Sequence, residues 1–156
     1  MLSGYRVLDL SDHRGQLAGQ ILADLGAEVI LVEPPGGSPA RAEGPFVAGH
    51  EGDPDRSLWF WAYNRGKRGV VLDLDSADGQ DGLRRLARHA DLLIESEAPG
   101  VMAARGLGPE DLASDNPALV YTSITPFGQT GPKAGWTATD LTVVAAGMQL
   151  GMMGDE

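Results

Sequence analysis

Residues 5–32 of the sequence, YRVLDLSDHRGQLAGQILADLGAEVILV, contain a strand–helix–strand pattern that decides the fold class. The apolar runs 5–10 and 28–32 predict two buried strands, and the segment 16–25 between them has the apolar periodicity of a helix. The apolar face of this helix consists of Leu17, Ile21, Leu22 and Leu25. Gly26 then provides a natural helix stop. A connection of this length can join two parallel strands, so the pattern predicts a parallel crossover unit.

The same alternation continues along the chain. Further apolar runs predict strands at 69–74, 91–94 and 119–123, and helices are predicted after Ser76 and over 109–113. Strands that alternate with helices predict an α/β fold with a Rossmann-like, doubly wound and mainly parallel sheet of about five or six strands. The 156 residues suit one compact domain.

Two segments interrupt this alternation. Residues 34–56 are polar and irregular, which is typical of a binding loop or a mobile segment. The aromatic group that follows is interpreted as a core or interface anchor in preference to an adenine platform. Its members are Trp59, Phe60, Trp61 and Tyr63. The apolar stretch 141–153 ends close to the last residue, which indicates either a fragment of a longer chain or a terminal helix docked on the sheet.

The composition disfavours several function classes. A net charge of −10 repels nucleic-acid phosphates and anionic lipids, so neither nucleic acid nor a membrane is an expected partner. The sequence contains no cysteine, which excludes disulfides and thiolate chemistry and fits a cytoplasmic protein. The amino terminus lacks the pattern of a signal peptide, and no apolar run approaches the roughly 18 residues that span a bilayer.

The turn after the first strand is a candidate anion site. It lacks the glycine pattern G-x-G-x-x-G of dinucleotide-binding proteins, so this route to NAD binding is not expected. It still delivers Asp12, His13, Arg14 and Gly15 to the amino end of a helix, where free N–H groups attract anions. A plain capping turn explains the same residues equally well.

The densest basic cluster is Arg65, Lys67 and Arg68, immediately before the third predicted strand. Phosphate groups favour such a cluster, with Arg41 in the preceding loop as a second contact. A solvated charged turn is the favoured alternative, because exposed charge runs are frequent. The three histidines, His13, His50 and His89, are scattered and lack helical metal-site spacing, so no metal is predicted.

The order and spacing of several segments resemble the class III (family III) CoA-transferases. The segments are RVLDLS at 6–11, LADLGAEVILVEPPGG at 22–37, NRGKRGVVLDLDS at 64–76 and NPALVYTSITPFGQTGP at 116–132. Members of this family include formyl-CoA and carnitine-CoA transferases, and the α-methylacyl-CoA racemases share the fold. The resemblance implies that 1–156 is the amino-terminal portion of a longer chain.

The resemblance also implies a function. Family members move coenzyme A between carboxylic acids through an aspartyl intermediate, and the family pattern places that aspartate beyond Glu156. Such a carboxylate divides a difficult acyl transfer into easier steps. The implied ligands are an acyl-CoA and a carboxylic acid, and the implied assembly is a homodimer or a heteromer with a related subunit. This chain alone is then inactive.

Several residues match CoA-contacting positions of the family. These are His13, Arg14, Gln16, Arg41, Leu72, Asp73, Pro99, Gly100 and Arg105, the last displaced by one position. Three positions depart from the family pattern. The family usually has a lysine at the position of Asp75, an aromatic residue at that of Glu97 and an arginine at that of Ala104. The departures favour an alternative, a degenerate structural half that pairs with an active subunit. The racemase alternative is disfavoured because Thr139 replaces a histidine.

Overall fold

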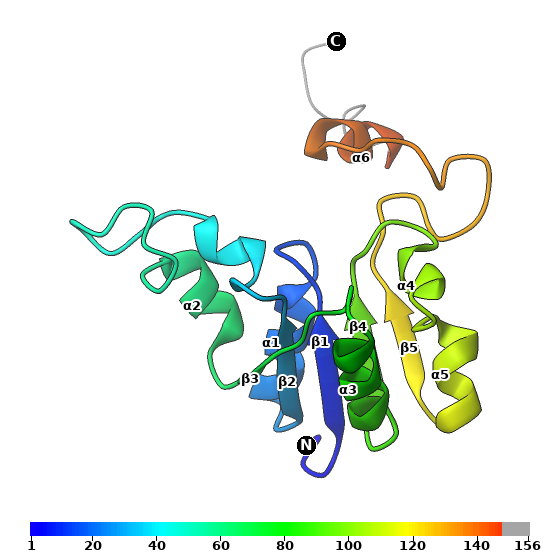
Figure 1. The fold of residues 1–156 in the computed structure, drawn as a ribbon. Coiled ribbons are helices and arrows are strands. Elements are labelled where there is room, and N and C mark those ends of the chain that lie inside the picture. The colour runs from blue at the N-terminus through cyan, green and yellow to red at the C-terminus, as the bar shows by residue number, and fades with distance from the viewer. Residues whose placement is uncertain (148–156) are drawn as a thin grey trace.

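A five-stranded sheet forms the centre of the computed structural model, which describes residues 1–147 (Figure 1). The strands are β1 (Arg6–Leu10), β2 (Glu28–Glu33), β3 (Arg68–Val71), β4 (Leu92–Glu95) and β5 (Val120–Ser123). Their spatial order is β3-β2-β1-β4-β5, and every neighbouring pair is parallel. This arrangement confirms the predicted doubly wound α/β sheet.

Helices connect the strands and cover both faces of the sheet (Figure 1). They are α1 (Gln16–Asp24), the 3-10 helix η1 (Pro39–Ala42), α2 (Leu58–Asn64), α3 (Ala77–Ala87), α4 (Val101–Ala104), α5 (Pro109–Asp115) and α6 (Asp140–Ala146). Side chains alternate along β1, because successive residues of a strand point to opposite faces. Leu8 therefore packs against Leu83 of α3, whereas Val7 packs against the α1 side of the sheet.

The third strand is shorter than predicted and begins one residue earlier. Its pairing with β2 ends where Val71 lies opposite Glu33, although the N–H of Leu72 still donates to the Glu33 carbonyl at 2.9 Å. The chain then leaves the sheet, and Leu72 and Leu74 pack against the core formed by α3, α4 and α5. Along the predicted run only Val70, Leu72 and Leu74 are partly buried, and Val71 is 61% exposed on this edge strand.

The predicted apolar face of α1 is wrong. Leu17, Ile21 and Leu25 are exposed, and only Leu22 packs against the sheet. The buried face of the helix consists of Gln16, Gly19 and Gln20. This inversion occurs because α1 covers a buried polar cluster beneath it, described below, and the small Gly19 allows the helix to approach that cluster closely.

The long segment after β2 is ordered around a small apolar cluster. It contains η1 and a single antiparallel bridge between Phe46 and Ser57. Phe60 packs with Leu31 and Ala40, and partly buried Trp59 packs against the same cluster, which confirms the core-anchor interpretation for these two aromatic residues. Trp61 is exposed.

The carboxyl-terminal helix α6 lies apart from the sheet, beyond the carboxyl ends of the strands (Figure 1). None of its residues is buried, so the predicted docking of a terminal helix on the sheet is wrong for its described part. Thr139 caps the helix by accepting a hydrogen bond from the N–H of Thr142. The rest of the apolar stretch, 148–153, lies outside the described residues.

We expect Gly19→Ala to destabilise the protein by more than about 2 kcal/mol, even though alanine is the better helix former. A Cβ at this position lies 2.1 Å from Oδ2 of buried Asp9, and nothing there can yield without breaking an ion pair. Chemical denaturation measures the effect. The exposed Ile21→Ala change in the same helix is the control and should cost less than about 1 kcal/mol. A neutral Gly19→Ala change contradicts the packing described here.

Candidate functional site

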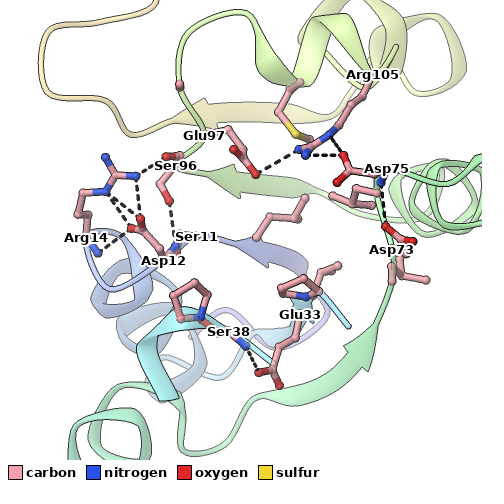
Figure 2. A pocket seen from close by; sticks show the side chains of 18 residues that line it. Ser11, Asp12, Arg14, Glu33, Ser38, Asp73, Asp75, Ser96, Glu97 and Arg105 are labelled. Carbon is pink, nitrogen blue, oxygen red and sulfur yellow. Dashed lines mark hydrogen bonds and ion pairs between the residues drawn. The ribbon is translucent and has the colours of Figure 1, made fainter. Parts of the chain in front are cut away.

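A cavity of about 310 Å³ opens at the carboxyl ends of the strands (Figure 2). Its walls come from the segments that follow β1, β2, β3 and β4, together with α4. The chain runs outward from β1 to β2 and β3, then returns to place β4 on the other side of β1. The cavity therefore lies at the point where the strand order reverses, which is where doubly wound sheets bind ligands.

The β1–α1 turn forms one wall and is closed by its own backbone hydrogen bonds. The N–H groups of Gly15 and Gln16 donate to the carbonyl of Asp12, at 3.0 and 3.1 Å. The N–H of Arg14 donates to the carboxylate of Asp12 at 2.9 Å. The carboxylate of Asp12 thus closes the turn before the helix, whereas α1 begins after Gly15 with no hydrogen bond from a capping side chain.

Arg14 joins this turn to the loop after β4. Its Nη2 lies 2.7 Å from Oδ2 of Asp12 and donates to the carbonyl of Ser96 at 2.6 Å. The hydroxyl of Ser96 in turn accepts from the N–H of Asp12 at 2.9 Å. Burial alone would raise the pKa of Asp12, but the hydrogen bonds from Arg14 hold that pKa below its ordinary value. Two loops that are 84 residues apart in the sequence are fixed to each other in this way.

Arg105 closes the opposite side of the cavity (Figure 2). Its Nη2 lies 2.7 Å from Oδ1 of Asp75, and its Nη1 donates to Oε1 of Glu97 at 3.2 Å. Burial alone would lower the pKa of Arg105, but its carboxylate partners outweigh burial and raise that pKa. The residue therefore stays cationic while it bridges the β3–α3 and β4–α4 loops.

Glu33 forms the floor at the end of β2. It is buried, and Nε of Arg41 donates to its Oε2 at 2.6 Å. Arg41 also lies 3.1 Å from Asp55 and stacks 4.0 Å from the ring centroid of Phe60. Hydrogen bonds from Arg41 are the main reason that the pKa of Glu33 lies below its ordinary value. Arg41 does not line the cavity.

A buried polar cluster lies behind the cavity wall. Nζ of Lys67 donates to Oδ2 of Asp9 at 2.8 Å, to the carbonyl of Gln16 at 2.9 Å and to Oδ1 of Asn64 at 2.9 Å. The side chains of Lys67 and Asp9 are 1% and 0% exposed. The expectation of a solvated basic turn is therefore wrong for Lys67. Its ammonium group is buried and already bonded to three acceptors, so it cannot contact a ligand in the cavity. Burial lowers the pKa of Lys67, although the charge of Asp9 opposes this effect.

The amide of Gln16 extends the same cluster. Its Oε1 accepts from Nδ2 of Asn64 at 2.8 Å, and its Nε2 donates to the carbonyl of Ser11 and to the hydroxyl of Ser38, both at 3.2 Å. The other two basic residues of the predicted cluster are exposed at the rim of the sheet, where Arg65 pairs with Asp24 and Arg68 pairs with Glu28.

The structure brings together only part of the predicted site. The predicted residues that line the cavity are Arg14, Leu72, Asp73 and Arg105. Those that do not line it are His13, Gln16, Arg41, Pro99 and Gly100. His13 lies against Trp59, with ring centroids 6.4 Å apart, and Gly100 lines a separate cavity beside β5. Ligand contacts by these five residues stay predictions.

Glu33, Ser38 and Met102 are among the cavity residues that sequence reasoning missed. Glu33 gave a usable signal, because it is an acidic residue at the end of a buried strand and directly before a Pro-Pro-Gly-Gly turn. Ser38 and Met102 gave no such signal. Within residues 1–147, no three acidic or histidine side chains gather closely enough to hold a metal ion. In the same part of the chain, none of the helices has the length and apolar character needed to cross a bilayer.

The fold and the position of its cavity define a doubly wound α/β ligand-binding protein. A model of the CoA-transferase family III matches residues 2–156, so the chain belongs to this family. It is 45% identical to the probable fatty acyl-CoA transferase Rv3272 of Mycobacterium tuberculosis, over 97% of this chain and 38% of the relative. It is 44% identical to the succinyl-CoA:(R)-benzylsuccinate CoA-transferase subunit BbsE of Thauera aromatica, over 92% of this chain and 35% of the relative.

Solved structures agree with this assignment. A CAIB/BAIF family protein from Brucella suis superposes with a TM-score of 0.89 and 38% identity, over 99% of this chain and 41% of that one. The orthorhombic crystal form of Rv3272 gives a TM-score of 0.84 and 44% identity, over 98% of this chain and 42% of that one. The chain thus spans about two-fifths of the length of these relatives, which confirms the resemblance to an amino-terminal portion.

We expect Lys67→Met to cost about 3–5 kcal/mol of unfolding free energy, because it leaves the buried Asp9 carboxylate without its cation. The double variant Asp9→Asn with Lys67→Met buries no charge and should lose clearly less than the sum of the two single variants. Urea denaturation of the four proteins completes this cycle. Additive losses would contradict direct coupling between the two side chains.

We expect the stability of the protein to fall in acid partly through Glu33. Because its pKa is lowered in the folded state, its contribution is complete above its unfolded pKa of about 4.3 and is lost as the pH falls through the folded value. Glu33→Gln should be less stable at pH 7 by about 1–3 kcal/mol and should show a shallower loss below pH 4. Denaturation at several pH values tests this, with exposed Glu51→Gln as the matched control. Equal slopes for Glu33→Gln and wild type rule the effect out.

Proposed function

We propose that this chain forms the CoA-binding portion of an acyl-CoA:carboxylate CoA-transferase, and that the cavity at the strand ends receives the nucleotide end of coenzyme A. Membership of CoA-transferase family III supports the carrier. The observation that carries the proposal is the cavity at the reversal of strand order, with Arg14 on one rim and Arg105 on the other. Guanidinium groups suit phosphate because their planar donors match its oxygens.

The size and lining of the cavity fit part of coenzyme A. A volume of about 310 Å³ is at the lower end of the roughly 300–1,000 Å³ of ligand pockets, so it suits the adenosine end and leaves the pantetheine arm outside. Apolar side chains supply the surface for a base, and they are Leu10, Val32, Leu72, Leu74 and Met102. Apart from Glu33 on the floor, the charged residues lie around them at the rim, where phosphate groups would remain partly solvated (Figure 2).

The chemistry of the whole protein is also part of the proposal. The family pattern places the nucleophilic aspartate beyond Glu156, so residues 1–156 hold the carrier while that carboxylate attacks the thioester. The substrates are then an acyl-CoA and a carboxylic acid. The assembly is a homodimer or a heteromer with a related subunit, and the BbsE relative is itself named as a subunit.

A second candidate is a degenerate half that pairs with an active subunit and has only a structural role. The charge of the cavity favours this candidate. Five carboxylates line it, against two guanidinium groups; the acids are Asp12, Glu33, Asp73, Asp75 and Glu97. A racemase-like activity has less support, because Thr139 is occupied in capping α6.

Isothermal titration with CoA separates these candidates. For a CoA-binding portion we expect micromolar affinity, and Arg105→Ala should weaken it at least about tenfold through the loss of a charged hydrogen bond. Arg68→Ala removes the same charge from an exposed site outside the cavity and should leave the affinity unchanged. Arg41→Ala separately tests the sequence-based prediction that Arg41 contacts CoA, which requires that this variant bind CoA more weakly. An absence of heat at millimolar CoA would favour the structural half.

A further inference from the structure

Both guanidinium groups of the cavity are already paired with carboxylates before any ligand binds. Arg14 pairs with Asp12 at 2.7 Å, and Arg105 pairs with Asp75 at 2.7 Å and with Glu97 at 3.2 Å. Since five carboxylates line the cavity, its empty state carries an excess of negative charge. An anionic ligand can therefore gain an arginine only by displacing a carboxylate of the protein.

The partners of Arg105 imitate a bound phosphate. Nε and Nη2 of Arg105 both lie within 2.9 Å of Oδ1 of Asp75, and Nη1 donates to Oε1 of Glu97. All three nitrogen atoms of the guanidinium group thus face oxygen anions. Phosphate oxygens use the same donors, because their spacing matches the guanidinium fork. A phosphate that binds in the same bidentate way must therefore take the Nε and Nη2 donors that Asp75 now holds.

The pair at Arg105 opens more easily than the pair at Arg14. The carboxylate of Asp12 also accepts from the N–H of Arg14, and the N–H of Asp12 donates to Ser96, so Arg14 cannot release this carboxylate without loosening the β1–α1 turn. The side chain of Asp75 is 78% exposed and that of Glu97 is 43% exposed. Exposed carboxylates can turn into water at little cost, since exposed ion pairs contribute little.

We propose that Asp75 and Glu97 compete with a phosphate group of coenzyme A for Arg105 and thereby limit the affinity of this cavity for CoA. This inference rests on the proposed function and adds to it two residues that set affinity without contacting the ligand. Removal of either negative charge should free Arg105 for the phosphate. It should also reduce the repulsion between the rim and the ligand, which solvent screens only in part.

Titration of the chain with CoA tests the competition. Asp75→Asn and Glu97→Gln should each tighten CoA binding about two- to fivefold, and the double variant about tenfold, which corresponds to opening weak exposed ion pairs. Adenosine carries no phosphate, so its affinity should not differ between the variants. In an Arg105→Ala background the same substitutions should lose most of their effect.

Asp81→Asn is the matched control, because it removes the same charge from α3, where Asp81 pairs with Arg85 at 3.3 Å outside the cavity. It should change CoA affinity by less than about 1.5-fold, as a distant screened charge does. Unchanged or weaker CoA binding by the Asp75 and Glu97 variants overturns the competition, while wild-type binding would keep the proposed function. An undiminished gain without Arg105, or an equal gain for adenosine, also overturns it.

The remaining outcomes separate the two proposals further. If wild type shows no binding at millimolar CoA and the double variant binds, the competition is supported, while the wild-type chain behaves as the structural half. If neither protein binds at millimolar CoA, the proposed function fails and the competition fails with it. Circular dichroism of each variant confirms that the fold is retained, as the exposure of the two carboxylates leads us to expect.

Discussion

The buried ion pair between Lys67 and Asp9 is the interaction on which the rest of the structure depends. It joins the end of β1, the start of α1 and the connection from α2 to β3, which are far apart in the sequence. A buried charge without its partner is costly, so the three elements hold one relative position. Gly19 contributes by bringing α1 close enough to cover the pair, and Gln16 links the same cluster to the loop after β2.

This cluster holds in place two of the loops that form the cavity, because it lies beneath them and is hydrogen-bonded to both. The first residue of α1 belongs to the buried network, so the turn that precedes the helix is held at the mouth of the sheet. Arg14 and Ser96 then tie that turn to the loop after β4 across the reversal of strand order. A site that binds a flexible carrier benefits from such fixed walls, because less ordering is needed when the ligand enters.

Acidic side chains outnumber basic ones around the cavity. Several basic side chains near the cavity form ion pairs with acidic residues of the same chain. Lys67 pairs with Asp9, Arg41 with Glu33, and Arg105 with Asp75 and Glu97. Since the chain spans about two-fifths of its relatives, further charges of a complete protein can change this balance. The internal pairing of the described residues is nevertheless a property of this sequence.

The sequence by itself determined the order of strands and helices, the parallel crossover and the family, because periodicity and motif spacing are local patterns that do not depend on distant contacts. It also singled out Arg14, Leu72, Asp73 and Arg105, which line the cavity. Only the tertiary structure decided which face of α1 is buried and which basic residues are free. These outcomes depend on contacts between distant residues such as Asp9 and Lys67, 58 residues apart. A buried charge needs its partner, so α1 covers this pair while Leu17 and Ile21 stay exposed.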